Sequence, residues 1–352
     1  MIDKPINITR RGLLPLSLAS MLALAQEKEN FIQEPEEGHV DFATGVKIVN
    51  LLATVRDKQG KPLPGLTKDN FIVEEDGKRQ EIQYFSKESN QPLTLGFLVD
   101  VSGAMRTYIP AERNATYRFI NRILREDQDQ AFIFRFYRNV ELMSFLSNSR
   151  AKLETALAKL EDPPPATKGN FQYQVNGMFY GSAIFNSLYI AADTVMRKQT
   201  GRKALILMSD GEDTGSTSTV TSAIEAAQRA DTIIYTLGFY DQSAINGLGG
   251  QGGAVQRPGR AVMTRLAQET GGRYFDTTST MTVDQIFDAI QEELRHQYSL
   301  GYTPTNSLPG YRKIKITVKD NKGASVQARE GYYSGDGPDE AQKRKINSKA
   351  KF

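Results

Sequence analysis

Two aspartates, Asp100 and Asp210, each come at the end of a run of apolar, strand-forming residues and just before a glycine-containing turn. Ser102 closely follows the first aspartate, and Ser182 stands between the two runs at the start of an amphipathic stretch. Carboxylate and hydroxyl oxygens are the ligands that a hard cation such as Mg²⁺ prefers. These four side chains are therefore the candidate metal ligands of the chain.

Enzymatic chemistry at the same residues is disfavoured by side chains that the sequence lacks. A phosphatase of the haloacid dehalogenase kind needs a second Asp shortly after the first, and Ser102 occupies that position. A serine hydrolase needs a histidine beside its nucleophile. The chain has only His39 and His296, and both lie outside the stretch that carries the aspartates. We therefore expect a binding protein and not an enzyme.

The segments that carry the candidate ligands alternate between strand-like and amphipathic helical patterns from residue 93 to about residue 294. Such alternation indicates an α/β fold with a doubly wound, mostly parallel sheet and helices on both faces. In an open sheet of this kind, ligands bind at the edge where the strands end, and both aspartates are expected there. Strands are expected at 93–100, 131–136, 140–145, 203–208, 232–237 and 273–275, and helices at 111–124, 151–160, 182–196, 220–230, 261–270 and 283–294.

Two segments inside this region lack a regular pattern. Three prolines at 163–165 end a helix, and the irregular stretch that follows to Tyr180 contains several aromatic residues. These aromatics either contact a ligand beside the metal edge or hold the loop against the domain. The glycine-rich stretch 247–253 lacks the Gly-Lys-Ser/Thr ending of a phosphate-binding loop, so we interpret it as a linker.

The sequence on either side of the α/β region has a β pattern. Residues 46–55 and a hairpin over 70–82, which turns at Asp76-Gly77, precede this region. Segments with two-residue alternation at 297–302, 312–318 and 326–333 follow it. The chain thus begins and ends its ordered part with strands.

Taken together, these motifs resemble a von Willebrand factor type A (VWA) domain. The metal-ion-dependent adhesion site (MIDAS) of that family has the form Asp-x-Ser-x-Ser, followed by a distant Thr and a distant Asp. Asp100 and Ser102 match the first motif, Asp210 matches the last, and Ser182 stands where the family has Thr. The resemblance covers residues 93–294 and implies the Rossmann-like VWA fold. The flanking β segments are similar to those of VWA-related proteins found in acidobacteria.

The resemblance also implies a role for each candidate ligand. Asp100, Ser102 and Ser182 would bind the metal through side-chain oxygens, and Asp210 would do so directly or through a water. Ala104 occupies the position of the family's second serine and offers no oxygen. The site is therefore either a weakened site for Mg²⁺, Mn²⁺ or Ca²⁺, with a water in the missing position, or a metal-free remnant.

In metal-competent relatives, the open coordination position is filled by a carboxylate of the partner. The resemblance therefore implies a protein-binding or adhesion module whose partner is another protein with an accessible acidic residue. The alternative is a scaffold protein that works without metal and binds through its flanking β segments. Because both ends of a VWA domain emerge opposite the metal edge, these segments are expected to pack there as one small β-subdomain. Glu212 and Asp213 either tune the metal site or cap a helix, and capping is favoured.

The composition and the N-terminus indicate an exported protein without a nucleic-acid partner. The formal net charge is only +3, with basic residues spread among acidic ones. The sequence has no cysteine, which excludes disulfides, thiol catalysis and a lipid-anchored lipoprotein. Arg10 and Arg11 precede an apolar stretch that ends in Ala23-Leu24-Ala25, as in a twin-arginine or a general secretory signal. No later stretch is long enough to span a membrane, so we expect a periplasmic or secreted protein.

These patterns together predict the organisation of the whole chain. We expect a signal peptide at 1–25, a linker at 26–42, an N-terminal β segment at 43–90, the VWA domain at 91–296, a C-terminal β segment at 297–335 and a disordered tail at 336–352.

Overall fold

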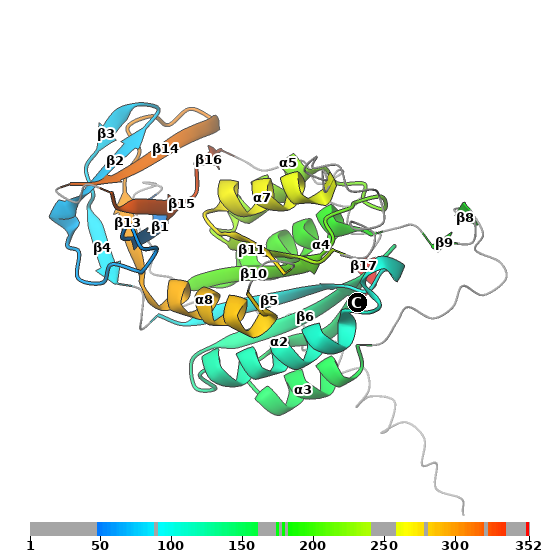
Figure 1. Cartoon of the computed structure of the whole chain (residues 1–352). Helices are drawn as coiled ribbons and strands as arrows, with labels where there is room; N and C mark the ends of the chain where they lie inside the picture. Colours follow the sequence, from blue (N-terminus) through cyan, green and yellow to red (C-terminus); the bar gives the residue numbers. More distant parts are fainter. Residues whose placement is uncertain are drawn as a thin grey trace, which may run out of the picture. The chain divides into compact units, whose positions relative to one another are not determined.

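A seven-stranded, mostly parallel sheet forms the centre of the computed structural model (Figure 1). The structure describes residues 48–87, 91–160, 174–175, 178–179, 182–240, 258–277, 281–319, 323–335 and 350–351. All of these belong to one compact unit that spans 47–352, and residues 1–46 form a separate unit. The expected signal peptide and linker therefore lie outside the described residues.

The order of the central strands brings the two apolar runs side by side. The strands in spatial order are β12 (Tyr274–Asp276), β11 (Ile233–Gly238), β10 (Arg202–Ser209), β5 (Leu93–Asp100), β6 (Gln130–Phe136), β7 (Val140–Ser147) and β17 (Ala350–Lys351). The first five run parallel, whereas β7 is antiparallel to β6 and β17 is parallel to β7. Every residue of β5 and of β10 is buried, which is why both strands are apolar runs and not alternating patterns.

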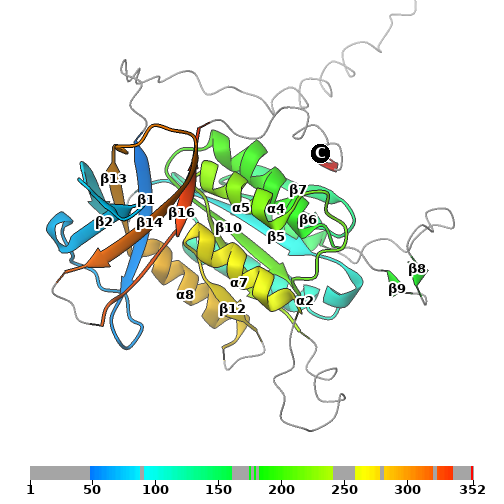
Figure 2. The same ribbon diagram turned by 90° about the horizontal axis from the view of Figure 1, so that it is seen from above.

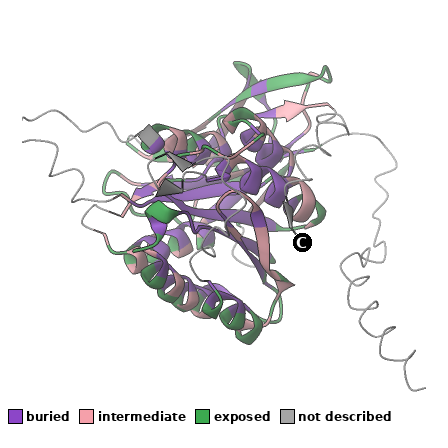
Figure 3. Cartoon of the chain, turned by 90° about the vertical axis from the view of Figure 1, so that its right-hand side faces the viewer, coloured by how far each residue is buried: buried purple, intermediate pink, exposed green. Residues whose placement is uncertain are grey.

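Helices cover both faces of this sheet, as predicted. One face carries α2 (Ile109–Ile123), α3 (Arg150–Ala158) and α8 (Val283–Arg295). The other carries α4 (Ile184–Ile190), α5 (Val220–Arg229) and α7 (Pro258–Thr270). Successive residues of β5 point to opposite faces, so Phe97 packs with the first group of helices and Leu98 with the second. Figure 3 shows the buried residues concentrated on the central strands and on the inner sides of the helices.

The helix predicted at 182–196 is less regular than its sequence pattern indicates. It is α-helical only over α4, widens to a π-helical turn at Ala191–Val195 and ends in a 3₁₀ turn at Met196–Lys198. Further 3₁₀ turns occur at Lys68–Asn70 and Gly103–Met105. The apolar residues of the sequence do not distinguish these helix types, because each of the three turns contains buried residues.

The two irregular segments of the sequence fall largely outside the described residues. Within the stretch after the prolines, β8 (Gln174–Val175) pairs with β9 (Met178–Phe179), and the glycine-rich stretch is not described. The predicted tail is described only at β17. In the described part of the chain, no helix is both long and apolar enough to cross a membrane.

Strands from the two flanks of the chain pair with each other, as predicted. One sheet has the order β15 (Ser325–Ala328), β1 (Val49–Arg56), β13 (Gln297–Tyr302) and β4 (Tyr84–Lys87). The other has the order β16 (Gly331–Ser334), β14 (Gly310–Val318), β2 (Phe71–Glu75) and β3 (Lys78–Gln80). Apolar residues of both sheets form one core between them. The single strand predicted at 326–333 is wrong, because this segment is divided between β15 and β16 in different sheets, and β4 was not predicted.

The flanking sheets meet the central domain at the C-terminal ends of its helices. Gln327 donates to the carbonyl of Gly271 just after α7, and Arg329 donates to the carbonyl of Gln228 in α5. These helices run antiparallel to the strands, so their C-terminal ends lie at the edge where the strands begin. The flanking sheets therefore lie opposite the edge where β5 and β10 end, and Figure 2 shows both sheets gathered at one side of the domain.

Candidate metal centre

The candidate ligands lie where the direction of strand addition reverses in the central sheet. After β5, the chain adds β6 on one side of β5 and later β10 on the other side. Helical connections diverge at such a switch point and leave a crevice outside the strand ends, where open α/β sheets bind their ligands. Asp100 is the last residue of β5, and Asp210 directly follows β10. The register therefore brings the two aspartates to the same crevice.

Asp100 is the buried centre of the site, with no exposed surface. Its Oδ1 accepts a hydrogen bond from the Ser102 N–H at 2.9 Å. Its Oδ2 accepts from Ser182 Oγ at 2.9 Å and from Ser209 Oγ at 2.6 Å. Burial raises the pKa of this carboxyl, and the hydrogen bonds only partly offset that effect. The structure thus groups Asp100, Ser102 and Ser182, and it adds Ser209, which we did not predict.

Ser182 is held in place by the loop that follows β10. The N–H groups of Thr214 and Gly215 both donate to its carbonyl oxygen, at 3.1 and 2.9 Å. In the same loop, Asp213 accepts a hydrogen bond from the Phe185 N–H in the first turn of α4. Asp213 therefore has the capping position that the sequence favoured, and this cap ties the start of α4 to the end of β10.

Asp210 is half-buried, and its Oδ1 accepts a hydrogen bond from the Glu212 N–H at 2.9 Å. Gly211 behind it has a φ of +83°, and a Cβ there would lie 2.6 Å from the Gly259 carbonyl oxygen of α7. Only glycine fits this turn, because both the backbone angle and the neighbouring backbone exclude a side chain. Burial, and secondarily the charge of Asp100, raise the pKa of Asp210 to about 6.

Glu112 of α2 is a further acidic residue at the site that sequence reasoning missed. It is only 1% exposed, and among the described residues neither of its carboxylate oxygens has a hydrogen-bond partner. One turn further along α2, Thr116 contacts Met208 of β10, so Glu112 lies one turn closer to the strand ends. Burial and the nearby charge of Asp100 raise its pKa well above the usual value. In the sequence, its place among the apolar residues on the buried side of α2 was the feature that could have indicated a buried carboxylate.

In the described part of the chain, the acidic side chains of the site have no basic partner. Among the described residues, no Lys or Arg forms an ion pair with Asp100, Glu112 or Asp210. Within the same residues, no group of three His, Cys, Asp or Glu side chains is arranged to hold a metal ion. Serine hydroxyls would thus have to complete a metal site here. Hard oxygen donors and buried carboxyl groups without a basic partner among the described residues fit a divalent cation, which would favour their ionised forms.

In EDTA, the stability of the protein is expected to fall as the pH rises from about 4 to above 6. A folded-state pKa raised to about 6 means that Asp210 keeps its proton longer in the folded than in the unfolded chain. The stability that this proton contributes, roughly 1–3 kcal/mol, is fully present below pH 4 and lost as the pH passes 6. Urea unfolding across this range should show the decline, and Asp210→Asn should reduce it. An equal decline in the variant would contradict this assignment.

Comparison with known protein families assigns the chain to one of them. Residues 95–289 match the sequence profile of the von Willebrand factor type A domain. The chain belongs to this family. The resemblance drawn from the Asp100 and Asp210 motifs is therefore confirmed at the level of the family and its fold. No curated protein matches the chain.

The chain is also similar to solved structures at low sequence identity. One is proximal thread matrix protein 1 from the mussel byssus with a zinc-occupied MIDAS motif, at 13% identity and a TM-score of 0.45 over 62% of this chain and 49% of that chain. A von Willebrand factor type A protein from Catenulispora acidiphila has 12% identity and a TM-score of 0.43 over 83% of this chain and 75% of that chain. The vWF domain of the type V pili tip protein Mfa5 from Porphyromonas gingivalis has 13% identity and a TM-score of 0.41 over 57% of this chain and 94% of that chain. The chain spans about half the length of the mussel protein.

Proposed function

We propose that this VWA protein is an exported binding module that captures an acidic side chain of a partner protein through a divalent cation. Asp100, Ser102, Ser182 and Asp210 would hold the cation, with Mg²⁺ as the first candidate and Mn²⁺ or Ca²⁺ as alternatives. The observation that carries the proposal is the buried Asp100 carboxylate at the switch point, surrounded by hydroxyls and by further carboxylates that have no cationic partner among the described residues.

Each side chain has a distinct role in this proposal. Asp100 supplies the central charge, and the loop contacts of Ser182 fix its hydroxyl on the same carboxylate. Asp210 is less buried than Asp100 and would bind the cation directly or through a water. Ala104 is exposed in the turn after Ser102 and has no oxygen to offer, so a water would take the coordination position of the family's second serine. A bound cation would supply positive charge that a partner's carboxylate could complete.

The arrangement supports binding and not catalysis. A hydrolase serine would need an imidazole within hydrogen-bond reach. His296 follows the C-terminal end of α8, and its Nδ1 contacts the carbonyl oxygen of Glu292. The neighbouring Leu294 carbonyl accepts from Arg202 at the start of β10, so His296 lies at the edge opposite Asp100. Export to the periplasm or exterior rests on the N-terminal signal pattern of the sequence.

Peptide capture in the presence and absence of metal tests this function. Two peptide pools of equal length should be compared, one rich in Asp and Glu and the other with Asn and Gln in their place. We expect the acidic pool to show Mg²⁺-dependent retention that EDTA removes and that Asp100→Asn abolishes. Equal retention of both pools in Mg²⁺ would contradict the proposal. Retention that is unaffected by EDTA and by Asp100→Asn would favour the metal-independent scaffold.

A further inference from the structure

A hairpin in the flanking sheets is paired at one end and splayed at the other. At the end of the hairpin away from its turn, Gly310–Lys313 of β14 pair with β16, and the Ile314 N–H donates to the Glu330 carbonyl oxygen at 2.8 Å. Beyond this bond the two arms separate. Ile314–Val318 pair only with β2, and β15 pairs only with β1. In the described part of the chain, each arm therefore has one strand edge without a neighbouring strand.

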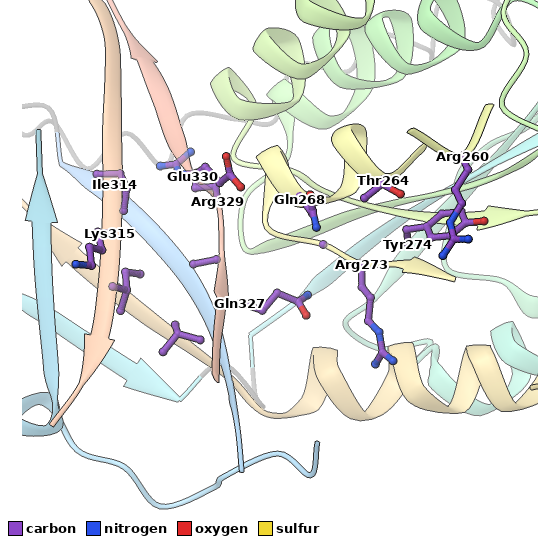
Figure 4. Close-up of a pocket in the computed structure, with 14 residues that line it drawn as sticks. Arg260, Thr264, Gln268, Arg273, Tyr274, Ile314, Lys315, Gln327, Arg329 and Glu330 are labelled. Carbon is purple, nitrogen blue, oxygen red and sulfur yellow. The ribbon is translucent and has the colours of Figure 1, made fainter. Parts of the chain in front are cut away.

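The splayed arms border a cavity of about 570 Å³. Its lining includes Ile314–Ile316 of β14 and Val326–Ala328 of β15. The opposite wall is a stripe of α7, in which Arg260, Thr264 and Gln268 recur every four residues and so share one face. Figure 4 shows this stripe on one side and Ile314 and Lys315 on the other, with the segment from Gln327 to Glu330 between them. The volume is within the usual range for ligand sites.

The cavity lining is predominantly positive. It contains the cationic side chains of Arg260, Arg273, Lys315 and Arg329 and only one carboxylate, that of Glu330. Arg273 and Arg329 already pair with carboxylates outside the lining. Arg260 is exposed and lies over the Tyr274 ring, and Lys315, whose side chain is 70% exposed, forms a long ion pair of 4.0 Å with Glu74 of β2. These two residues therefore offer positive charge to an incoming group at the edge of the cavity.

We propose that this cavity binds an extended acidic segment of a partner protein, which adds as a strand along the unpaired edge of β15. An unpaired strand edge presents N–H and C=O groups that an extended peptide can satisfy, and a small anion cannot. Acidic side chains of the added strand would contact Arg260 and Lys315. This binding does not use the metal centre, and it is independent of the function proposed above.

Fluorescence anisotropy with a labelled eight-residue peptide of alternating Glu and Thr, measured in EDTA at low salt, tests the proposal. We expect saturable binding that weakens at least about tenfold in the double variant Arg260→Glu/Lys315→Glu, because each reversal turns a close attraction into a repulsion. The control Lys61→Glu/Lys152→Glu has the same net charge, and its exposed positions lie outside the cavity lining. It should bind as the wild type does. Matching urea midpoints establish that both variants are folded.

A second peptide separates strand addition from simple charge attraction. The same sequence with N-methyl groups on alternate residues keeps its charge but cannot form the strand hydrogen bonds, so its binding should be lost. Equal affinity of the two double variants would overturn the proposal, as would equal binding of the N-methylated peptide or no binding up to millimolar concentration. The assay contains EDTA and should be unaffected by Asp100→Asn, so its failure would leave the metal-dependent function intact. Likewise, failure of the metal-dependent peptide capture would leave strand addition at β15 intact.

Discussion

Replacing Glu293 with glutamine is expected to lower the free energy of unfolding by about 3–5 kcal/mol, the usual effect of removing one member of a buried ion pair. The Glu293 carboxylate lies 2.5 Å from Arg56 of β1 and 3.2 Å from Arg273, and its side chain is 3% exposed. Gln327 of β15 also donates to it. Without this carboxylate, the largely buried Arg56 guanidinium has no counter-charge among the described residues, because it otherwise donates to the neutral amide of Gln327.

This cluster joins the flanking sheets to the central domain, so its loss should affect the whole unit. Urea unfolding followed by circular dichroism gives the free energy and its denaturant dependence. Glu292→Gln is the matched control, since Glu292 is the exposed neighbour on the same helix, and its effect should stay within about 0.5 kcal/mol. If the two variants were equally stable, the cluster would not hold the sheets to the domain.

Replacing Ala104 with serine is expected to tighten divalent metal binding at least about tenfold, because loss of a single supporting group typically changes metal affinity by 10–100-fold. Ala104 lies in the 3₁₀ turn that begins directly after Ser102, at the exposed rim of the site. A hydroxyl there would replace a water as a ligand and leave the buried core unchanged. Titration calorimetry with Mg²⁺ and Mn²⁺ measures the change.

The control for this substitution is Ala111→Ser, which adds a hydroxyl at an exposed position of α2 outside the motif. It should leave metal affinity unchanged, and both variants should unfold like the wild type in EDTA. An unchanged affinity in Ala104→Ser would mean that the side chain at this position does not face the cation, contrary to the proposed ligand set.

The sequence predicted the fold well where burial dictates pattern. The runs that became β5 and β10 are largely apolar because both faces are covered, and an aspartate ends the first and directly follows the second, so both could be placed at the sheet edge. The pairing of the flanking strands followed from their alternation and from the family resemblance. The division of residues 326–333 between two sheets could not be predicted in this way, because a chain that passes from one sheet to another keeps the same alternation.

The candidate site was only partly predictable for a related reason. Asp100, Ser102 and Ser182 were visible as motif positions, and the structure brings them into contact. Ser209 precedes Asp210 in the strand and reaches Asp100 only because β5 and β10 are neighbours. Glu112 lies on another element altogether, and its position beside the strand ends depends on how α2 packs. Such contacts depend on tertiary structure, which local sequence patterns do not describe.

Thermal unfolding of the folded chain with and without divalent metal tests the central claim most directly. At 100 times its dissociation constant, a cation that binds only the native state should add about 2.7 kcal/mol. That addition corresponds to a rise in Tm on the order of 5 °C. In EDTA at pH 8, Asp100→Asn should be at least as stable as the wild type, because it removes a buried charge, and it should show no response to metal. A wild-type Tm that millimolar Mg²⁺, Mn²⁺ and Ca²⁺ all leave unchanged would contradict the account.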